Sequence, residues 1–570
     1  MDNQDVFSYI TTQKNKWLTE RIKLSDSKDW NMHEHIERCY NVANGWFHKG
    51  KNDGMRPYDD IVTPVINVAF RSEGFDVKDI TPYVNDASEY YKSFLVKKFH
   101  PQWARNNELD TFIDEVVETS IIYDLVIVKD IKQTRPEVVN PKDIAFCNQK
   151  NVLAGPICTE HSYALDELLE MEDIWDKDAV ERAYQLYIAN PPADGELKVF
   201  ELRGKLPATW LDETSSAKKY KDQVQIVTFI KDSTGKEEGT VLYKGISKPL
   251  KDVFKVLKID QVRSSNRAAG KSIVETLFEP QVWNNYAGIK LKALLDSAIN
   301  VLVTDSDELG NQKLSDLKNN QILKQGKGDN TYRLDGTLQN LPAFAQYQEK
   351  QSNDARILGS ASEASLGKNP NAGTPFALQS LIVQEGQGIH EYRQGKIATF
   401  FADVLYRDLI LGYLADELNK GQKFSEELTL EELSEVADLV VGHEVEEEIK
   451  AIILDNKIPP PDIREQLIAI KKAEFMKGGS RRFMEVMKDE IKDIPLNVFV
   501  NISGKQKKLA ENADKLTNII REIIANPQAF SQIPGIGKAF NELLEASGMS
   551  AIDFSAVTNA PALEQEQVPA

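Results

Sequence analysis

Apolar residues recur at helical intervals along two stretches of the chain, residues 272–298 and 343–362. This spacing predicts two helices. The stretch between them, residues 299–342, carries several glycines and two short runs rich in apolar and β-branched residues, Ile299–Thr304 and Thr331–Leu334. Glycines interrupt helices, and such runs favour strands. The pattern therefore predicts a helix, a small insert with short strands, and a second helix.

A polar loop and a long helix are predicted next. The loop covers Leu366–Gly373, after which Thr374 suits a helix N-cap and Pro375 suits the first helical position. Apolar residues then keep helical spacing without an intervening proline up to Leu418, which gives a helix of roughly 65 Å. Three glycines lie within residues 386–395, and we expect a kink there.

The N-terminal half divides into a helical part and a strand-rich part. Residues 1–130 are expected to be mainly helical, with helices at 81–100 and 107–122 and a strand at Ile121–Val128. In residues 131–260, alternation of apolar and polar positions predicts antiparallel strands around an acidic helix at about 163–188. The alternating runs are Leu197–Leu202, Val224–Ile230 and Thr240–Tyr243.

The C-terminal part is more strongly charged. Residues 425–492 are expected to be helical, whereas Leu496–Ile502 alternates and predicts a strand. Further helices are expected at 505–525 and 537–546, followed by a polar, disordered tail. Together these expectations define an α+β chain that is mainly helical.

Composition narrows the functional classes. With 570 residues, 41% of them hydrophobic, the chain can form several domains with apolar cores. Its formal net charge of −19 disfavours wrapping of DNA, which needs clustered Lys and Arg, although DNA can still slide past a like-charged wall. The N-terminal residues lack the apolar core of a signal peptide, and no apolar run approaches the roughly 20 residues that span a bilayer. We therefore expect a protein made in the cytoplasm, without a membrane partner.

Residues with metal-binding or nucleophilic chemistry are few and scattered. Cys39, Cys147 and Cys158 are widely separated, so we expect free thiols that are buried or half-buried. His33, His35 and Cys39 offer metal ligands on one helix. The two histidines, however, diverge by about 200° around a helix axis, which favours an ordinary helix surface.

Two other motifs are incomplete. His443 opens an acidic run that lacks the second histidine of the HExxH metal motif, so a solvated acidic face is favoured. Gly326-Lys327-Gly328 lacks the spacing of a phosphate-binding loop, so a turn is favoured. The apolar stripe of the long helix favours a core or a subunit interface over a cofactor site. We therefore expect no catalytic residues, no metal and no cofactor.

The sharpest local motif is Ile533–Phe540, which contains Gly535, Gly537 and Lys538. It resembles the hairpin of helix-hairpin-helix modules, in which glycine N–H groups at a helix N-terminus contact a DNA phosphate. Only Lys538 adds positive charge nearby. Two interpretations stay open, a DNA contact and a plain turn between helices, and the turn is favoured.

Four segments occur in an order that resembles one known family. They are Glu137-Val-Val-Asn-Pro-Lys-Asp-Ile144, Phe200-Glu-Leu-Arg-Gly-Lys-Leu-Pro207, Gly270-Lys-Ser-Ile-Val-Glu-Thr-Leu277 with Gln281 and Asn284-Asn285, and Gly373-Thr374-Pro375 before the long helix. The family is the portal protein, or head-to-tail connector, of tailed bacteriophages. The second segment departs from the family pattern, because Leu202-Arg203 stands where an aromatic residue is more usual.

The resemblance implies a domain organisation. Residues 1–271 and 374–504 would form the wing, residues 272–298 and 343–362 two stem helices, and residues 299–342 a small α/β clip. Residues 363–373 would form a tunnel loop, and residues 505–570 a helical crown with a flexible tail. In this arrangement the wing contains the antiparallel strands.

The resemblance also implies partners. The family forms a homo-oligomeric ring, usually of twelve copies, at one capsid vertex, where it meets the major capsid protein. The ring conducts double-stranded DNA during packaging and ejection, without sequence preference. Its clip docks the packaging terminase and later a neck or tail adaptor protein. The chain would therefore be assembled in the host cytoplasm and would reside in the virion.

DNA-facing positions follow from the same resemblance. In the tunnel loop they are Gly367, Lys368, Asn369 and Asn371, and on the first stem helix they are Lys290 and Lys292. For the two stem lysines, surface ion pairs with Glu or Asp neighbours are an equal alternative. Two other functions also remain open: a DNA-processing protein that uses the 533–540 hairpin, and another virion structural protein such as a capsid or adaptor component.

Overall fold

The computed structural model describes residues 4–26, 28–45, 59–84, 90–131, 135–192, 195–212, 214–216, 218–231, 234–261, 264–297, 301–304, 331–334, 341–361, 388–427, 433–434, 437, 441–442, 444–446, 448–450, 463–477, 481–486 and 496–500. The chain forms two compact units. The first comprises Met1–Gly74, Asp114–Lys129 and Glu137–Arg393, and the second comprises Phe75–Ile113, Asp130–Pro136 and Gln394–Ala570. The mixture of helices with antiparallel sheets agrees with the predicted α+β class.

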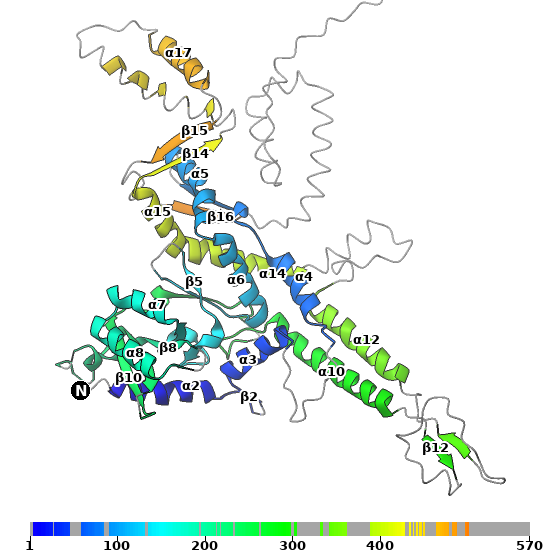
Figure 1. The fold of residues 1–570 in the computed structure, drawn as a ribbon. Coiled ribbons are helices and arrows are strands. Elements are labelled where there is room, and N and C mark those ends of the chain that lie inside the picture. Colours follow the sequence, from blue (N-terminus) through cyan, green and yellow to red (C-terminus); the bar gives the residue numbers. More distant parts are fainter. Residues whose placement is uncertain are drawn as a thin grey trace, which may run out of the picture. The chain divides into compact units, whose positions relative to one another are not determined.

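A five-stranded antiparallel sheet is the largest sheet of the first unit (Figure 1). Its strand order is β10-β9-β8-β7-β6, with β6 at Ile144–Phe146, β7 at Ile157–Tyr163, β8 at Leu197–Pro207, β9 at Tyr220–Lys231 and β10 at Glu237–Ile246. Because side chains alternate along a strand, Leu197 and Val199 of β8 face one core cluster, whereas Leu202 and Leu206 face another.

Helices cover both faces of this sheet. The cluster around Leu197 is completed by α7 (Leu165–Glu170) and α8 (Lys177–Ala189), which are joined by η6 (Met171–Asp173). The cluster around Leu202 is completed by the N-terminal helices α1 (Gln4–Tyr9), η1 (Ile10–Lys14, a π-helix) and α2 (Asn15–Thr19). The predicted strands of residues 131–260 are therefore confirmed, whereas the acidic helix predicted at about 163–188 is divided into α7 and α8.

A second, three-stranded sheet has the fully buried strand β4 (Val126–Lys129) at its centre. Its neighbours are β5 (Glu137–Val138) and β11 (Phe254–Leu257), both antiparallel to β4. Short elements complete this part of the unit: β1 (Ile22–Ser25), β2 (Lys28–Trp30), η4 (Pro141–Asp143), η5 (Val152–Ala154), η7 (Ala208–Trp210) and α9 (Leu250–Val253). Longer helices are α3 (Met32–Ala43), α4 (Thr63–Glu73) and α6 (Leu109–Tyr123), of which residues from Asp114 on belong to the first unit.

Two long helices lie side by side in the first unit (Figure 1). They are α10 (Ile273–Ser297) and α12 (Leu341–Leu358), and they match the predicted helices at 272–298 and 343–362. Between them in sequence, β12 (Val301–Thr304) pairs with β13 (Thr331–Leu334) in antiparallel register, from Val301↔Leu334 to Thr304↔Thr331. The predicted helix–strands–helix order is therefore confirmed for the described residues.

The second unit combines helices with two strand pairs. β3 (Ile80–Val84) pairs with β16 (Leu496–Val500), and β14 (Gln422–Glu427) pairs with β15 (Arg481–Val486). The helices are η2 (Val77–Asp79), α5 (Tyr90–Asn106), α14 (Gly388–Phe400, in the first unit up to Arg393), η10 (Phe401–Ile410, a π-helix), α15 (Leu411–Asn419) and α17 (Ile463–Lys477). Phe401 packs edge-on against Phe75 and Phe112 in the core.

Several sequence predictions are wrong in detail. Residues 80–84 form a strand instead of a helix start, Ile22–Ser25 form a strand within the region expected to be mainly helical, and the charged region 425–492 includes two strands. The long helix is continuous from Gly388 to Asn419 and includes a π-helical stretch at Phe401–Ile410. The kink expected within residues 386–395 stays a prediction, because that stretch begins outside the described residues. The part of this helix predicted before residue 388 lies outside the described residues. Within those residues, no helix is long and apolar enough to cross a bilayer.

Candidate functional site

The residues of the Gly270–Leu277 motif build the start of α10. Ser272 acts as the N-cap, since its hydroxyl accepts a hydrogen bond from the Glu275 backbone N–H at 2.9 Å. Glu275 is bound by both terminal nitrogens of Arg267, at 3.0 and 2.6 Å. This two-point ion pair fixes the approach of the chain to the helix.

Gly270 lies against the buried side chain of Asp124. A Cβ added to Gly270 would stand 1.7 Å from Asp124 Oδ2. Asp124 holds its place because its carboxylate accepts the backbone N–H groups of Ile259 and Asp260, and its main-chain carbonyl accepts that of Gly270. Burial raises the pKa of Asp124 to about 6, although the Arg393 charge and these backbone bonds favour the ionised form. The glycine is therefore required for close packing.

The amides of the same motif hold the segment that leads into α4. Gln281 accepts the Ile61 N–H at 3.0 Å and donates to the Asp59 carbonyl at 2.7 Å. Asn284 donates to the Asp59 carbonyl and carboxylate at 3.1 and 3.2 Å. Both amide side chains are buried, so they replace the water that this backbone would otherwise bind. The sequence showed these amides but gave no indication of their partner.

α10 and α12 run antiparallel. Residues near the start of α10, such as Glu275, share a pocket with Ile357 and Leu358 at the end of α12. Farther along α10, Trp283 and Tyr286 lie next to Tyr347, near the start of α12. The two helices therefore leave from and return to the same part of the first unit, with β12 and β13 between them in sequence.

An aromatic surface lies on this helix pair. Trp283, Tyr286 and Tyr347 are 50%, 48% and 38% exposed, and they line a hollow of about 300 Å³ together with Ala287, Ala343 and Phe344. The rings of Trp283 and Tyr286 meet edge-on at 5.9 Å between centroids. Clustered aromatic side chains that remain open to solvent are typical of surfaces that bind another protein.

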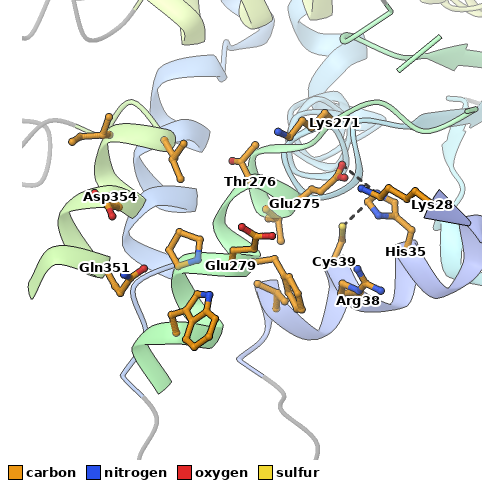
Figure 2. Close-up of a pocket in the computed structure, with 17 residues that line it drawn as sticks. Lys28, His35, Arg38, Cys39, Lys271, Glu275, Thr276, Glu279, Gln351 and Asp354 are labelled. Carbon is orange, nitrogen blue, oxygen red and sulfur yellow. Dashed lines mark hydrogen bonds and ion pairs between the residues drawn. The ribbon is translucent and has the colours of Figure 1, made fainter. Parts of the chain in front are cut away.

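A larger pocket of about 620 Å³ opens near the start of α10 (Figure 2). It brings together His35 and Cys39 of α3 and Glu275 of α10. His35 Nε2 lies 3.7 Å from Cys39 Sγ and 3.7 Å from Glu275 Oε2. These residue types occur in cysteine nucleophile sites, but there the thiol and the acid contact different imidazole nitrogens, whereas here both lie next to Nε2.

The protonation states of this cluster do not fit such a site. Burial raises the pKa of the Cys39 thiol to about 12 and lowers the pKa of His35 to about 4. Near neutral pH the pair is therefore a thiol next to a neutral imidazole, whereas a cysteine nucleophile acts as the thiolate. The arrangement favours a buried polar cluster that packs α3 against α10.

Of the three metal ligands suggested on α3, His35 and Cys39 lie in contact, whereas His33 lies apart from them. His33 stacks on Phe146 with 5.5 Å between ring centroids, and Glu34 pairs with Arg21. Among the described residues, no group of three or more His, Cys, Asp or Glu side chains is arranged to hold a metal ion. All three cysteines are free thiols, with Cys39 and Cys158 buried and Cys147 half-buried, which confirms the expectation for them.

Of the other predicted site residues, the structure describes the two lysines of α10 but not the loop and hairpin residues. Lys290 and Lys292 are exposed on α10, and the Lys290 ammonium lies 5.4 Å from the centre of the Tyr286 ring. The tunnel-loop residues, the 533–540 hairpin, Gly326–Gly328 and His443 lie outside the described residues. Of the acidic run after His443, Glu444 and Glu448 pair with Lys471, and Glu446 pairs with Arg464, which agrees with a solvated acidic face.

Comparison of the chain with known protein families gives no matching family model, and comparison with curated proteins gives no matching relative.

Proposed function

We propose that this chain is the subunit of a phage portal, a non-catalytic ring at one capsid vertex through which DNA is packaged and ejected. The observation that carries the proposal is the antiparallel pair α10/α12, which brackets the strands β12 and β13 and starts at a tightly fixed motif. In a ring of identical subunits, such a pair can line the channel and present a small docking module at its end. In this proposal α10 and α12 are the stem helices, and residues 299–342 are the clip.

The aromatic surface of the helix pair supports assembly. Two helices alone bury little apolar surface, and here Trp283 and Tyr286 remain half exposed. In a ring of identical subunits, each pair is covered by its neighbour, which removes these side chains from water. At about 25 cal/mol per Å² of apolar area, a few buried aromatic side chains contribute several kcal/mol to each interface.

Conduction of DNA requires weak, non-specific contacts. The net charge of −19 keeps phosphate binding low, whereas Lys290 and Lys292 on α10 add local positive charge. The tunnel-loop residues Gly367, Lys368, Asn369 and Asn371 are assigned the same role by the resemblance. The ring would take its double-stranded DNA from a terminase bound to the clip, and an adaptor protein would later replace the terminase there.

A charge placed on the aromatic surface tests the proposal. Trp283→Glu should prevent ring assembly, because the neighbouring subunit would have to bury a carboxylate. Tyr220→Glu is the matched control, since Tyr220 is 63% exposed on β9 of the five-stranded sheet. Mass photometry of the full chain would report the assembly state. Rings that persist in Trp283→Glu, or that are lost equally in both variants, would count against the stem assignment.

A further inference from the structure

The end of α12 is capped in an uncommon way. The Ser360 N–H donates to the Ile357 carbonyl and the Ala361 N–H to the Arg356 carbonyl, which is the Schellman pattern. In that pattern the residue with positive φ is usually glycine, but here it is Ser360, with φ of 52°. The glycine stands one position earlier, at Gly359, because a Cβ there would lie 2.0 Å from Val65 Cγ1 of α4. Packing against α4 therefore requires glycine at position 359. The residue with positive φ is then Ser360, whose backbone conformation is strained.

His390 of α14 contacts the Gly359 carbonyl of this cap. Its Nε2 lies 3.1 Å from the Gly359 oxygen, and its Nδ1 lies 2.9 Å from Oε1 of Glu73. Both partners are acceptors, whereas a neutral imidazole has only one N–H to donate. Both contacts are therefore hydrogen bonds only when each ring nitrogen carries a hydrogen.

The surroundings of His390 are charged and closed to water. Glu73 also accepts Arg393 Nε at 2.9 and 3.0 Å, and Arg393 donates to the Ser120 carbonyl at 3.0 Å. The side chains of Glu73, His390 and Arg393 are 0%, 2% and 6% exposed. Water cannot replace a lost partner at such a site, so each missing hydrogen bond costs the full desolvation free energy of the unpaired group.

Further charges lie beyond Arg393. Its NH1 is 3.8 Å from Asp124 Oδ1, and Lys258 and Asp260 face Asp124 from the stretch after β11. The charged groups that face the His390 ring are therefore Glu73 and Arg393, with Asp124, Lys258 and Asp260 behind Arg393.

We propose that His390 is a proton-dependent latch on the end of α12. With two ring hydrogens it ties Gly359 of α12 to Glu73 of α4. With one hydrogen it releases one of the two, and the strained Ser360 turn loosens. Gly270, near the start of α10, donates a hydrogen bond to Asp124 of the same cluster. The latch therefore affects how firmly both α10 and α12 are held. This proposal does not depend on the ring function.

Hydrogen exchange of the full chain tests the latch. The amides of Gly359, Ser360 and Ala361 should lose protection about tenfold or more as the pH rises through the imidazole titration, after correction for intrinsic exchange rates. His390→Gln should abolish this pH dependence, because an amide does not titrate in this range. His100→Gln is the matched control. His100 is equally buried, contacts the Tyr406 hydroxyl at 3.0 Å, and has a pKa lowered by burial to about 4, so its removal should leave the pH dependence unchanged.

A second measurement needs no variant. Nitrogen NMR of the histidine rings of the wild-type chain counts the hydrogens on each ring, and the His390 ring is recognised by its proximity to the Glu73 carboxylate. Two ring hydrogens should be present at every pH at which the end of α12 is protected. A singly protonated ring together with a protected α12 end, or protection that ignores the titration, would overturn the proposal.

Discussion

Gly270→Ala is predicted to be the most destabilising single methyl addition at the root of the helix pair. The new Cβ would stand 1.7 Å from Asp124 Oδ2 and 2.5 Å from its Cγ, whereas carbon and oxygen atoms in contact are normally about 3.3 Å apart. The carboxylate has to leave its position, and its hydrogen bonds to Ile259 and Asp260 break. At about 1.5–3 kcal/mol for each bond to a charged group, the expected loss is roughly 3–6 kcal/mol.

Gly395→Ala is the matched control for this change. Gly395 lies inside α14, and an added Cβ meets no atom within 4 Å. Alanine should therefore stabilise the helix by about 0.5–1 kcal/mol. Urea unfolding of both variants, monitored by tryptophan fluorescence, would show whether the free energy of unfolding falls in Gly270→Ala and rises in Gly395→Ala. Equal effects of the two substitutions would refute the close-packing argument.

A double variant separates the clash from other effects. In Asp124→Gly the obstructing carboxylate is gone, and glycine accepts the φ of 48° found at this position. Gly270→Ala should then have little further cost, so the two free-energy changes should not add. Additive changes would show that the cost of Gly270→Ala arises elsewhere.

Three further predictions concern buried charge and the two exposed lysines of α10. Glu201→Gln should cost about 3–5 kcal/mol in urea unfolding, because Glu201 binds the buried Lys129 ammonium at 2.6 Å and Lys129 would lose its counter-charge. Because the pKa of Asp124 is raised from 3.8 to about 6, the folded state binds its proton more tightly than the unfolded chain does. Its contribution to stability should therefore rise by roughly 3 kcal/mol as the pH falls from 7 to below 4, and unfolding compared with Asp124→Asn, which lacks this titration, isolates that part. Replacing Lys290 and Lys292 by alanine should reduce the salt dependence of DNA association, by a slope of up to about 1.8 if both contact phosphate, and an unchanged slope would place them away from DNA.

The sequence predicted elements with strong local patterns. Leu197–Leu202 and Leu496–Ile502 alternate cleanly, and strands occur at both places. The helix–strands–helix order around residues 299–342 is also visible locally, because glycines within the insert interrupt the helical pattern between the two helices. Where hydrophobic period and turn residues agree, a single sequence is sufficient.

Elements defined by a distant or charged partner were missed. β3 exists because Ile80–Val84 pairs with Leu496–Val500, more than 400 residues later in the chain. In β14 and β15, the backbone register pairs Glu426 with Arg482 and Glu427 with Arg481. Such cross-strand pairs stabilise a sheet, but along one strand they have the appearance of a charged helix surface.

In the candidate site, too, local motifs could be predicted from the sequence and tertiary contacts could not. The sequence identified Gly270, Gln281 and Asn284 as a motif, but their partners Asp124 and Asp59 are set by tertiary packing. Glu73 and His390 are 317 residues apart and carry no motif, so their contact could not be predicted. Local chemistry was visible in the sequence, whereas the pairing of buried charges was not.

Direct imaging of the purified chain tests the proposal that it assembles as a ring. Negative-stain electron microscopy at micromolar concentration should show closed rings with a central hole, with a constant subunit number close to twelve. A population of monomers with no closed rings under the same conditions would contradict the account.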